Sequence, residues 1–136
     1  YCTFYCLIHF ICLKCLENQQ GPILIREVDP YGHFITIEHN GLTANKEQDM
    51  VGWVVKRAID SNKKIIYRFP SEFRLKSQTY VKILSRRASQ TLYSFEKENV
   101  LVAESIDTWG VGMKTIVNTL IDANGNERDV FTQTFP

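Results

Sequence analysis

The residues best suited to acid–base chemistry are two histidines, His33 and His39. A histidine activates a nucleophile only when a serine or cysteine hydroxyl or thiol lies within hydrogen-bond reach of its ring. Neither histidine has such a residue beside it in a nucleophile motif, and residues 16–136 contain no cysteine. We therefore expect no catalytic residues, no cofactor and no small-molecule substrate.

The carboxylates offer two closely spaced pairs, Glu96 with Glu98 and Glu127 with Asp129. Each pair can share one face of a strand, because side chains two residues apart point to the same side. A glycosidase needs its two carboxylates across a sugar, which adjacency in sequence does not supply. We therefore expect these acids to lie on exposed strand faces. The glycines of 110–112 lack the strand–helix context of a phosphate-binding loop and predict a turn or bulge.

The cysteines could hold a metal, and all four lie near the start of the chain, at Cys2, Cys6, Cys12 and Cys15. Cys12 and Cys15 could form a zinc half-site with His9, but a structural zinc site takes four ligands and no second pair follows. The apolar run of residues 1–16 is shorter than the roughly 20 residues that cross a bilayer. A zinc half-site, a membrane-associated or targeting piece, and a segment outside the folded module are the three interpretations. We favour the last, with no bound metal and no membrane span.

Basic residues gather in the middle of the chain. Residues 56–87 hold ten Lys and Arg and two acidic residues, whereas the net charge of the whole chain is +1. On β-strands, alternation places outward-facing basic side chains in this region, and the candidate strip consists of Lys56, Lys64, Arg68, Lys82, Arg86 and Arg87. Such residues either protect strand edges from pairing with other chains or bind phosphate, DNA or an acidic partner. We favour edge protection and keep the binding strip as the second hypothesis.

Two tryptophans are candidate core or rim aromatics. Trp53 has the same parity as Val55 and is expected to fill the core of a sandwich. Trp109 lies beside the polar Thr108 and is expected at the rim of the core or as a partly exposed contact residue. Arg57 has the parity of Trp53, so it either emerges at the strand end or needs a carboxylate partner, because a buried unpaired guanidinium is too costly.

Short β-strands separated by turns must position these residues. The tetrapeptide at 29–32, with Asp, Pro and Gly at its corners, predicts a type I turn, and Asn124-Gly125 predicts a hairpin. No stretch shows a sustained helical period. Alternating apolar residues predict about eight strands and an all-β sandwich, with strands at Pro22–Val28, His33–His39, Val51–Ile59, Lys64–Phe69, Thr79–Arg86, Thr115–Ile121 and Glu127–Thr132.

Length and composition predict one domain. The chain has 136 residues, of which 44% are hydrophobic and 23% charged, values typical of globular proteins rather than disordered or fibrous ones. It begins with Tyr, which we interpret as a sign of a fragment or a processed piece. We expect residues 1–20 to lie outside the fold and residues 21–136 to form the domain, whose lack of cysteine fits an intracellular compartment.

Five motifs in order resemble the lamin tail domain of intermediate filament proteins. They are GPILIREVDPYGHFI at 21–35, DMVGWVVKR at 49–57, YRFP at 67–70, FRLK at 73–76 and TWGVG at 108–112. The resemblance implies an immunoglobulin-like β-sandwich of about eight to nine short antiparallel strands. It also implies a non-catalytic interaction module that follows a coiled-coil rod, in nuclear lamins or in invertebrate cytoplasmic intermediate filaments.

Several departures from the family pattern bear on the compartment. Residues 83–90 carry neither the tryptophan nor the His-Ser-Pro-Pro loop frequent in the family, and Ala103 stands where a further tryptophan is common. The sequence ends at Pro136 without a prenylation box, and no heptad repeat precedes Gly21. These departures favour a cytoplasmic filament tail over a nuclear lamin.

The sequence therefore predicts the tail module of an intermediate filament protein, whose partners are other proteins. These partners are filament-associated proteins or further copies of the protein, joined through a rod that this sequence lacks. The alternative is a nucleic-acid or chromatin-binding module that acts through the basic strip of residues 56–87. For DNA we expect at most weak, non-specific binding, because no helix or aromatic platform is available to read bases.

Overall fold

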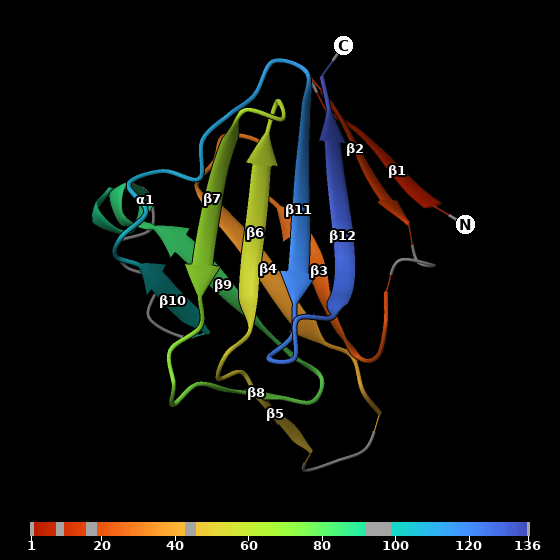
Figure 1. Cartoon of the computed structure of the whole chain (residues 1–136), viewed down its shortest axis with the longest axis vertical. Coiled ribbons are helices and arrows are strands. Elements are labelled where there is room, and N and C mark those ends of the chain that lie inside the picture. Colours follow the sequence, from red (N-terminus) through yellow and green to blue (C-terminus); the bar gives the residue numbers. More distant parts are fainter. Residues whose placement is uncertain (1, 8–9, 16–18, 43–45, 92–98, 136) are drawn as a thin grey trace.

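The protein folds as a sandwich of two β-sheets (Figure 1). The computed structural model describes residues 2–7, 10–15, 19–42, 46–91 and 99–135, with side chains from residue 19 onward. A six-stranded sheet has the order β1 (Cys2–Leu7), β2 (Phe10–Cys15), β12 (Glu127–Thr134), β11 (Thr115–Ile121), β6 (Val54–Ile59) and β7 (Lys63–Arg68). A four-stranded sheet has the order β10 (Val100–Ala103), β9 (Thr79–Ser85), β4 (Phe34–His39) and β3 (Ile23–Val28). The short strands β5 (Glu47–Asp49) and β8 (Arg74–Lys76) pair with each other at one end, and helix α1 (Arg86–Gln90) follows β9.

The predicted all-β sandwich is confirmed, and alternation explains its strands. All seven predicted strands are present, with ends that differ by at most three residues. In β6, Val55 and Ile59 are buried between the sheets, while Lys56 points outward. Because side chains in a strand alternate between its two faces, the apolar positions of each strand decide which face meets the core.

The main core lies between the two sheets and contains both tryptophans. Trp53 is 4% exposed and Trp109 is fully buried. From the connection between β10 and β11, the indole N–H of Trp109 donates a hydrogen bond to the carbonyl of Ile83 on β9, in the four-stranded sheet, at 3.0 Å. Tyr67 contacts the Trp109 ring edge-on, with ring centroids 6.1 Å apart. Trp109 is therefore a core residue that links the two sheets rather than a partly exposed contact residue.

The two predicted turns form as expected. The Gly32 N–H donates to the Asp29 carbonyl at 3.2 Å, and Gly32 has a φ of +78°. In the hairpin between β11 and β12, the Asp122 N–H donates to the Asn126 carbonyl at 2.9 Å. The Asp122 carboxylate also accepts the Asn126 N–H and the Arg128 side chain. These bonds hold the pKa of Asp122 below its ordinary value, with the Asn126 N–H as the largest cause.

Helix α1 was not predicted, and it covers part of the four-stranded sheet. The Ser85 hydroxyl caps the helix by accepting the Ala88 N–H at 3.2 Å. Leu84 shares the outer face of β9 with Lys82, but it is 1% exposed because Ala88 and Phe34 pack against it. Arg86, expected as the last residue of a strand, is instead the first residue of this helix.

The first strands differ from the expectation that residues 1–20 lie outside the fold. β2 pairs antiparallel with β12, and β1 pairs with β2, so their backbones extend the six-stranded sheet. Nearer the domain, the Gln20 N–H donates to the Arg128 carbonyl at 2.7 Å. His9 and the side chains of Cys12 and Cys15 lie outside the part of the chain that the structure describes. Whether the segment stabilises the domain stays a prediction.

Candidate interaction surface

The six residues of the predicted basic strip do not line up along one sheet. Lys56 lies on β6, and Lys64 and Arg68 lie on β7, all three on the outer face of the six-stranded sheet. Lys82 lies on β9, in the other sheet, while Arg86 and Arg87 belong to α1. We call the first set the sheet group (Lys56, Lys64, Arg68) and the second the helix group (Lys82, Arg86, Arg87).

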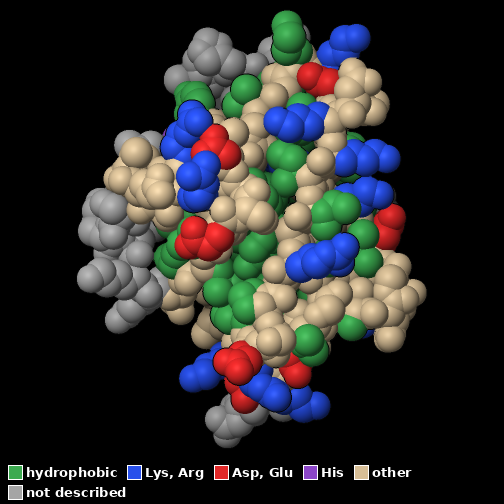
Figure 2. All heavy atoms as spheres, turned by 60° about the vertical axis from the view of Figure 1, so that its left-hand side comes forward, with side chains coloured by type: hydrophobic (Ala, Val, Ile, Leu, Met, Phe, Trp, Pro, Cys, Tyr) green, Lys and Arg blue, Asp and Glu red, His purple; other side chains and the backbone are tan. Residues whose placement is uncertain are grey.

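The sheet group surrounds an exposed isoleucine. The register of β6 and β7 places Lys56 directly opposite Ile66. Lys64 and Arg68 lie two residues before and after Ile66 on the same face, so they are diagonal neighbours of Lys56. Ile66 is 48% exposed, and Lys64 and Arg68 are exposed as well. Within the described residues, no carboxylate forms an ion pair with Lys64 or Arg68. Figure 2 shows the side of the molecule that carries β7, with Lys and Arg side chains beside exposed hydrophobic ones.

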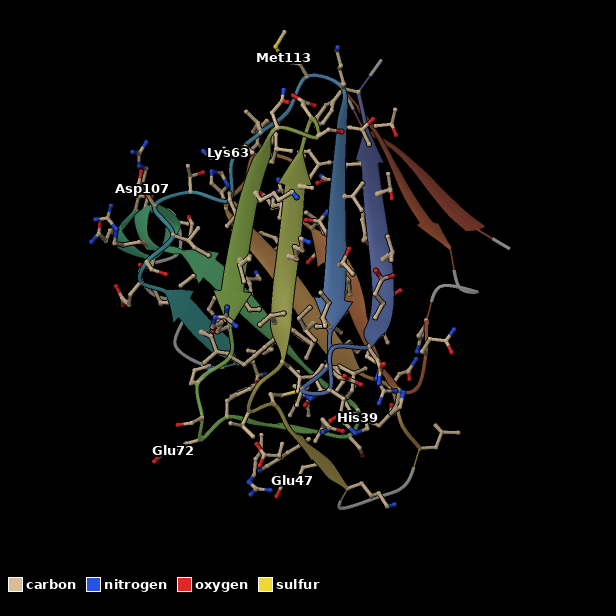
Figure 3. The ribbon with its side chains drawn as sticks, in the orientation of Figure 1. His39, Glu47, Lys63, Glu72, Asp107 and Met113 are labelled. Atoms are coloured by element: carbon tan, nitrogen blue, oxygen red, sulfur yellow. The ribbon has the colours of Figure 1, made fainter. Side chains whose placement is uncertain are left out.

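The helix group already has partners within the chain. The Arg86 and Arg87 guanidinium groups bind the two oxygens of the Asp107 carboxylate at 2.5 and 2.6 Å, next to α1 in Figure 3. The Lys82 ammonium lies 4.4 Å from the centroid of the Phe34 ring, within cation–π range. The Asp107 carboxylate offsets part of the positive charge of the helix group. The helix group should therefore attract a polyanion less strongly than the sequence predicted.

A groove opens beside the sheet group, between the two sheets. Its volume is about 430 Å³, with residues 66–68 and Pro70 on one wall and residues 102–105 on the other. Tyr67 is buried at the base of the β7 wall, and this burial raises the pKa of Tyr67 to about 12. The β7 wall thus offers an uncharged phenol facing the core and two cations facing outward. The groove was not predicted, because the four residues of β10 are too few to show a strand pattern in the sequence.

The carboxylates expected on exposed faces divide into two cases. Glu127 is exposed, but Asp129 is fully buried and accepts the Ile25 N–H of the opposite sheet at 2.7 Å. The expectation of an exposed face is therefore wrong for Asp129, because its parity matches that of the buried Phe131 on the same strand. Glu96 and Glu98 lie outside the described residues.

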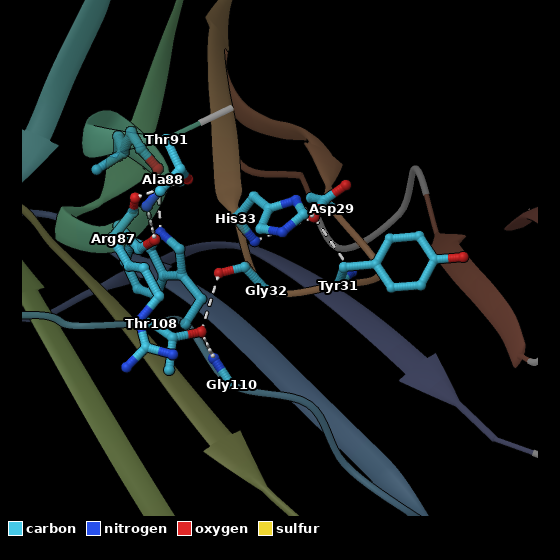
Figure 4. A network of polar contacts seen from close by, with 12 residues as sticks. Asp29, Tyr31, Gly32, His33, Arg87, Ala88, Thr91, Thr108 and Gly110 are labelled. Atoms are coloured by element: carbon cyan, nitrogen blue, oxygen red, sulfur yellow. Dashed lines mark hydrogen bonds and ion pairs between the residues drawn. The ribbon is translucent and has the colours of Figure 1, made fainter. Parts of the chain in front are cut away.

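The described contacts of His33 and His39 lie within local turns. His39 is 5% exposed, and its Nδ1 accepts the Gly41 N–H at 3.1 Å. Burial holds the pKa of His39 below its ordinary value. The Nδ1 of His33 lies 3.1 Å from the carboxylate of Asp29 in the first turn (Figure 4). Both side chains thus stabilise local turns.

The described residues contain no group of three or more His, Cys, Asp or Glu side chains placed to hold a metal ion. In the same part of the chain, no helix has the length and hydropathy needed to span a membrane.

Comparison with known proteins identifies the family. The Lamin Tail Domain family model matches residues 17–135, nearly the whole chain. The chain belongs to the lamin tail domain family. It therefore has the immunoglobulin-like sandwich of that family and is a structural module of intermediate filament proteins, not an enzyme. Membership also places the protein inside the cell.

The similar proteins include both filament proteins and a lamin. The chain is 32% identical over 117 residues to intermediate filament protein B of Ascaris suum, covering 86% of this chain and 19% of the relative. It is 32% identical over 117 residues to the 70 kDa neurofilament protein of Doryteuthis pealeii, covering 86% of this chain and 17% of the relative. It is 33% identical over 110 residues to Lamin-B3 of Xenopus laevis, covering 81% of this chain and 18% of the relative. The chain thus spans less than a fifth of the length of these relatives.

In this lamin tail domain, two motifs distant in sequence meet backbone to backbone. The Trp109 N–H donates to the Gly32 carbonyl at 2.9 Å. The Thr108 hydroxyl donates to the same carbonyl at 3.5 Å and accepts the Gly110 N–H at 3.1 Å (Figure 4). A side chain at Gly32 would put its Cβ 2.7 Å from the Gly110 carbonyl oxygen. The first turn and the Trp-Gly motif therefore fit together only because Gly32 has no side chain.

The same contact holds the buried guanidinium of Arg57. Arg57 is fully buried. Its described hydrogen bonds go to four neutral oxygens: the carbonyls of Trp109 and Gly110 (both 2.8 Å) and the side-chain amides of Asn118 (2.8 Å) and Gln133 (3.1 Å). The expectation that Arg57 emerges at the strand end is wrong. The other expectation was a carboxylate partner, whereas the described acceptors are neutral carbonyl and amide oxygens. These acceptors could not be predicted, because the sequence does not show that three distant segments converge on one side chain.

Proposed function

We propose that this lamin tail domain is the tail module of an intermediate filament protein and that it makes protein–protein contacts. The surface around Ile66 and the open groove beside it carry the proposal. This surface combines an exposed apolar side chain with the exposed cations Lys64 and Arg68, with which no carboxylate of the described residues forms an ion pair. The other candidate residues, such as Trp53, Trp109 and the helix group, are buried or already have partners within the chain. A filament-associated protein or another copy of the filament protein would be the partner, in line with the relatives named above.

A photo-cross-linking amino acid in place of Ile66, in the full-length protein in cells, tests this proposal. We expect covalent adducts that protease digests and nuclease leaves intact. The control carries the same amino acid at Leu42, which is 93% exposed on the connection between β4 and β5. Equal adducts at both positions, or none at position 66, would contradict protein contacts at this surface.

Nucleic-acid binding is the second candidate, and the charge of residues 56–87 is its support. The pairing of Arg86 and Arg87 with Asp107 weighs against it. Binding carried by phosphate contacts weakens linearly with salt on a log–log scale, with a slope set by the number of contacts. A DNA titration of the purified chain between about 50 and 200 mM salt therefore decides it, and a steep slope with sub-micromolar affinity would favour this candidate.

We also propose a cytoplasmic rather than nuclear location. The support is Ala103 in place of a frequent family tryptophan, together with the filament protein and neurofilament protein among the relatives. Immunofluorescence of the native protein tests it: filaments outside the nucleus support the proposal, and a nuclear rim contradicts it. An in-frame heptad repeat in the gene upstream of Tyr1 would independently support the filament assignment.

A further inference from the structure

We propose that β7 is a docking strand for an acidic, extended peptide segment of a partner protein, which adds to the six-stranded sheet as one more antiparallel strand. This inference rests on the proposed function and names the chemistry of the partner. Such strand addition takes its affinity from main-chain hydrogen bonds and its specificity from alternate side chains. A strand can add to β7 if β7 has free backbone groups at its edge, side chains that select the partner and space beside it.

The hydrogen-bond pattern identifies the free backbone groups of β7. β7 ends the order of the six-stranded sheet, with β6 on its other side. The Phe69 N–H donates to the Trp53 carbonyl at 3.1 Å, so residues of the same parity as Phe69 bond to β6. In an antiparallel pair the bonded positions alternate. The N–H and C=O groups of Lys64, Ile66 and Arg68 therefore point away from β6, and no described residue outside the ladder bonds to them.

The side chains at those positions specify the partner. Residues directly opposite each other in an antiparallel pair have their side chains on the same face and interact. Lys64 and Arg68 are exposed cations, and Ile66 between them is exposed and apolar. A complementary strand thus has acidic residues at the first and fifth of five positions, opposite Lys64 and Arg68, and an apolar residue at the third position, opposite Ile66.

The intervening residues of that strand would face the groove. Tyr67 and Ala103 are buried at its walls, and Glu104 is exposed at its border. Small or apolar side chains fit a space of about 430 Å³ beside these residues, whereas Glu104 disfavours further acidic residues there. The acidic positions are thereby confined to the outer face of the sheet.

A second copy of this chain is the wrong occupant. Antiparallel pairing of two β7 strands about Ile66 would place Lys64 of one copy opposite Arg68 of the other, and like charges directly opposite each other are destabilising. The two cations thus oppose pairing with an identical edge and favour an acidic one, so edge protection and selective docking follow from the same residues.

Amide hydrogen exchange of the 136-residue chain, measured by NMR, tests the geometry. The probe is a capped peptide with Glu-Ala-Val-Ala-Glu at its centre, and its control has Lys in place of both Glu. With the first peptide we expect exchange at Lys64, Ile66 and Arg68 to slow at least about tenfold, while Ile65 and Tyr67, already bonded to β6, change little. Binding without slower exchange at these three amides would overturn strand addition.

N-methylated peptides separate strand addition from charge attraction, with the protein unchanged. The central Val would lie opposite Ile66, with its N–H directed at β7, so N-methylation of this Val should abolish binding. N-methylation of a neighbouring Ala, whose N–H points away, should leave the affinity within about twofold. Equal affinities for the two methylated peptides would contradict the proposal.

Charge variants complete the test. K64E/R68E should weaken the acidic peptide at least about tenfold and improve binding of the Lys peptide. The matched control, K46E/K76E, makes the same change in net charge at exposed sites near β5 and β8 and should bind as the original chain does. Circular dichroism confirms folding of each variant, and an equal loss in both would overturn the proposal. Cross-linking at position 66 in cells without peptide binding would contradict strand addition alone, whereas peptide binding without cellular adducts would contradict the proposed function.

Discussion

The guanidinium of Arg57 is stabilised by oxygens that only the complete fold brings together. Its four acceptors come from the loop before β11, from β11 and from β12. A buried acceptor that loses its donor costs about 1–3 kcal/mol. Arg57 and Asp129 are therefore buried polar residues that stabilise an otherwise apolar core. Sequence parity placed Arg57 on the inward face of its strand but gave no sign that Asp129 is buried, and it indicated the partners of neither residue.

Arg57→Met should lower the free energy of unfolding by roughly 3–5 kcal/mol, because the apolar stem is kept while four acceptors lose their donor. Urea unfolding measures this loss. The neighbouring outward substitution Lys56→Met should stay within about 0.5 kcal/mol. A loss below about 1 kcal/mol for Arg57→Met would show that water or other groups replace the guanidinium.

Trp53→Ala should lower the free energy of unfolding by roughly 3–5 kcal/mol, the usual cost of removing a large buried aromatic side chain. The ring is 4% exposed and the Arg128 guanidinium lies 5.6 Å from its centroid. Urea unfolding again provides the measurement, and a change below about 1 kcal/mol would mean that the ring contributes little to the core.

His39 should make stability depend on pH in the weakly acidic range. Its folded pKa is lowered by burial, so the unfolded chain takes up the proton first. Its contribution is thus fully present above its unfolded pKa of about 6.5 and decreases as the pH falls below that value. Urea unfolding between pH 8 and pH 5.5 should show this decrease, and His39→Asn, which keeps an acceptor for the Gly41 N–H, should reduce it. An unchanged slope in the variant would contradict the assignment.

Among the elements, length decided what the sequence could predict. β11 has seven residues, long enough for a β-strand to be predicted over its full length, and its burial alternates from residue to residue. β5 and β8 have three residues each and β10 has four, too few to show a period. Helix α1 has five, so its only signal was the capping Ser85. The groove depends on β10 and was therefore out of reach, whereas the parity of Lys64 and Arg68 on β7 was predicted correctly.

Glycine substitutions compare two turns of similar backbone geometry. Gly32 has a φ of +78° and Gly125 a φ of +85°, so alanine at either position costs about 1–2 kcal/mol in backbone strain. At Gly125 no atom lies within 4 Å of an added Cβ, while at Gly32 the Gly110 carbonyl oxygen lies at 2.7 Å. Gly32→Ala should therefore destabilise the domain clearly more than Gly125→Ala in thermal unfolding. Equal losses would show that the two loops can separate at little cost.

For the molecule as a whole, the described core belongs to the lamin tail domain itself. The residues of its core clusters all lie between Ile23 and Phe135, and the family match begins at residue 17. The pairing of β2 with β12 adds backbone bonds at one edge only. We therefore expect the residues from Ile23 onward to carry most of the stability of the domain.

Deletion of residues 1–18 should leave the melting temperature within about 4 °C of the original value, because less than roughly 1 kcal/mol is expected to be lost. The deletion keeps Gln20, whose backbone bonds Arg128. Differential scanning calorimetry measures the shift, and addition of a chelator to the full chain should have no effect. A large drop would show that β2 is an integral strand, and stoichiometric zinc in the purified protein would revive the Cys12–Cys15 site.

The position of Arg57 in the chain also delays folding during synthesis, because its acceptors are synthesised much later. Asn118 follows Arg57 by 61 residues and Gln133 follows it by 76. At about 5–20 residues per second, the ribosome adds Gln133 roughly 4–15 s after Arg57. β6 lacks its neighbour β11 until Ile121 has been added, and the guanidinium lacks the Gln133 acceptor until the end of this interval. The six-stranded sheet of the nascent domain is therefore incomplete until nearly all of the domain has been synthesised. During this interval the apolar face of β6 is exposed, and a chaperone that binds apolar surface would have its largest effect.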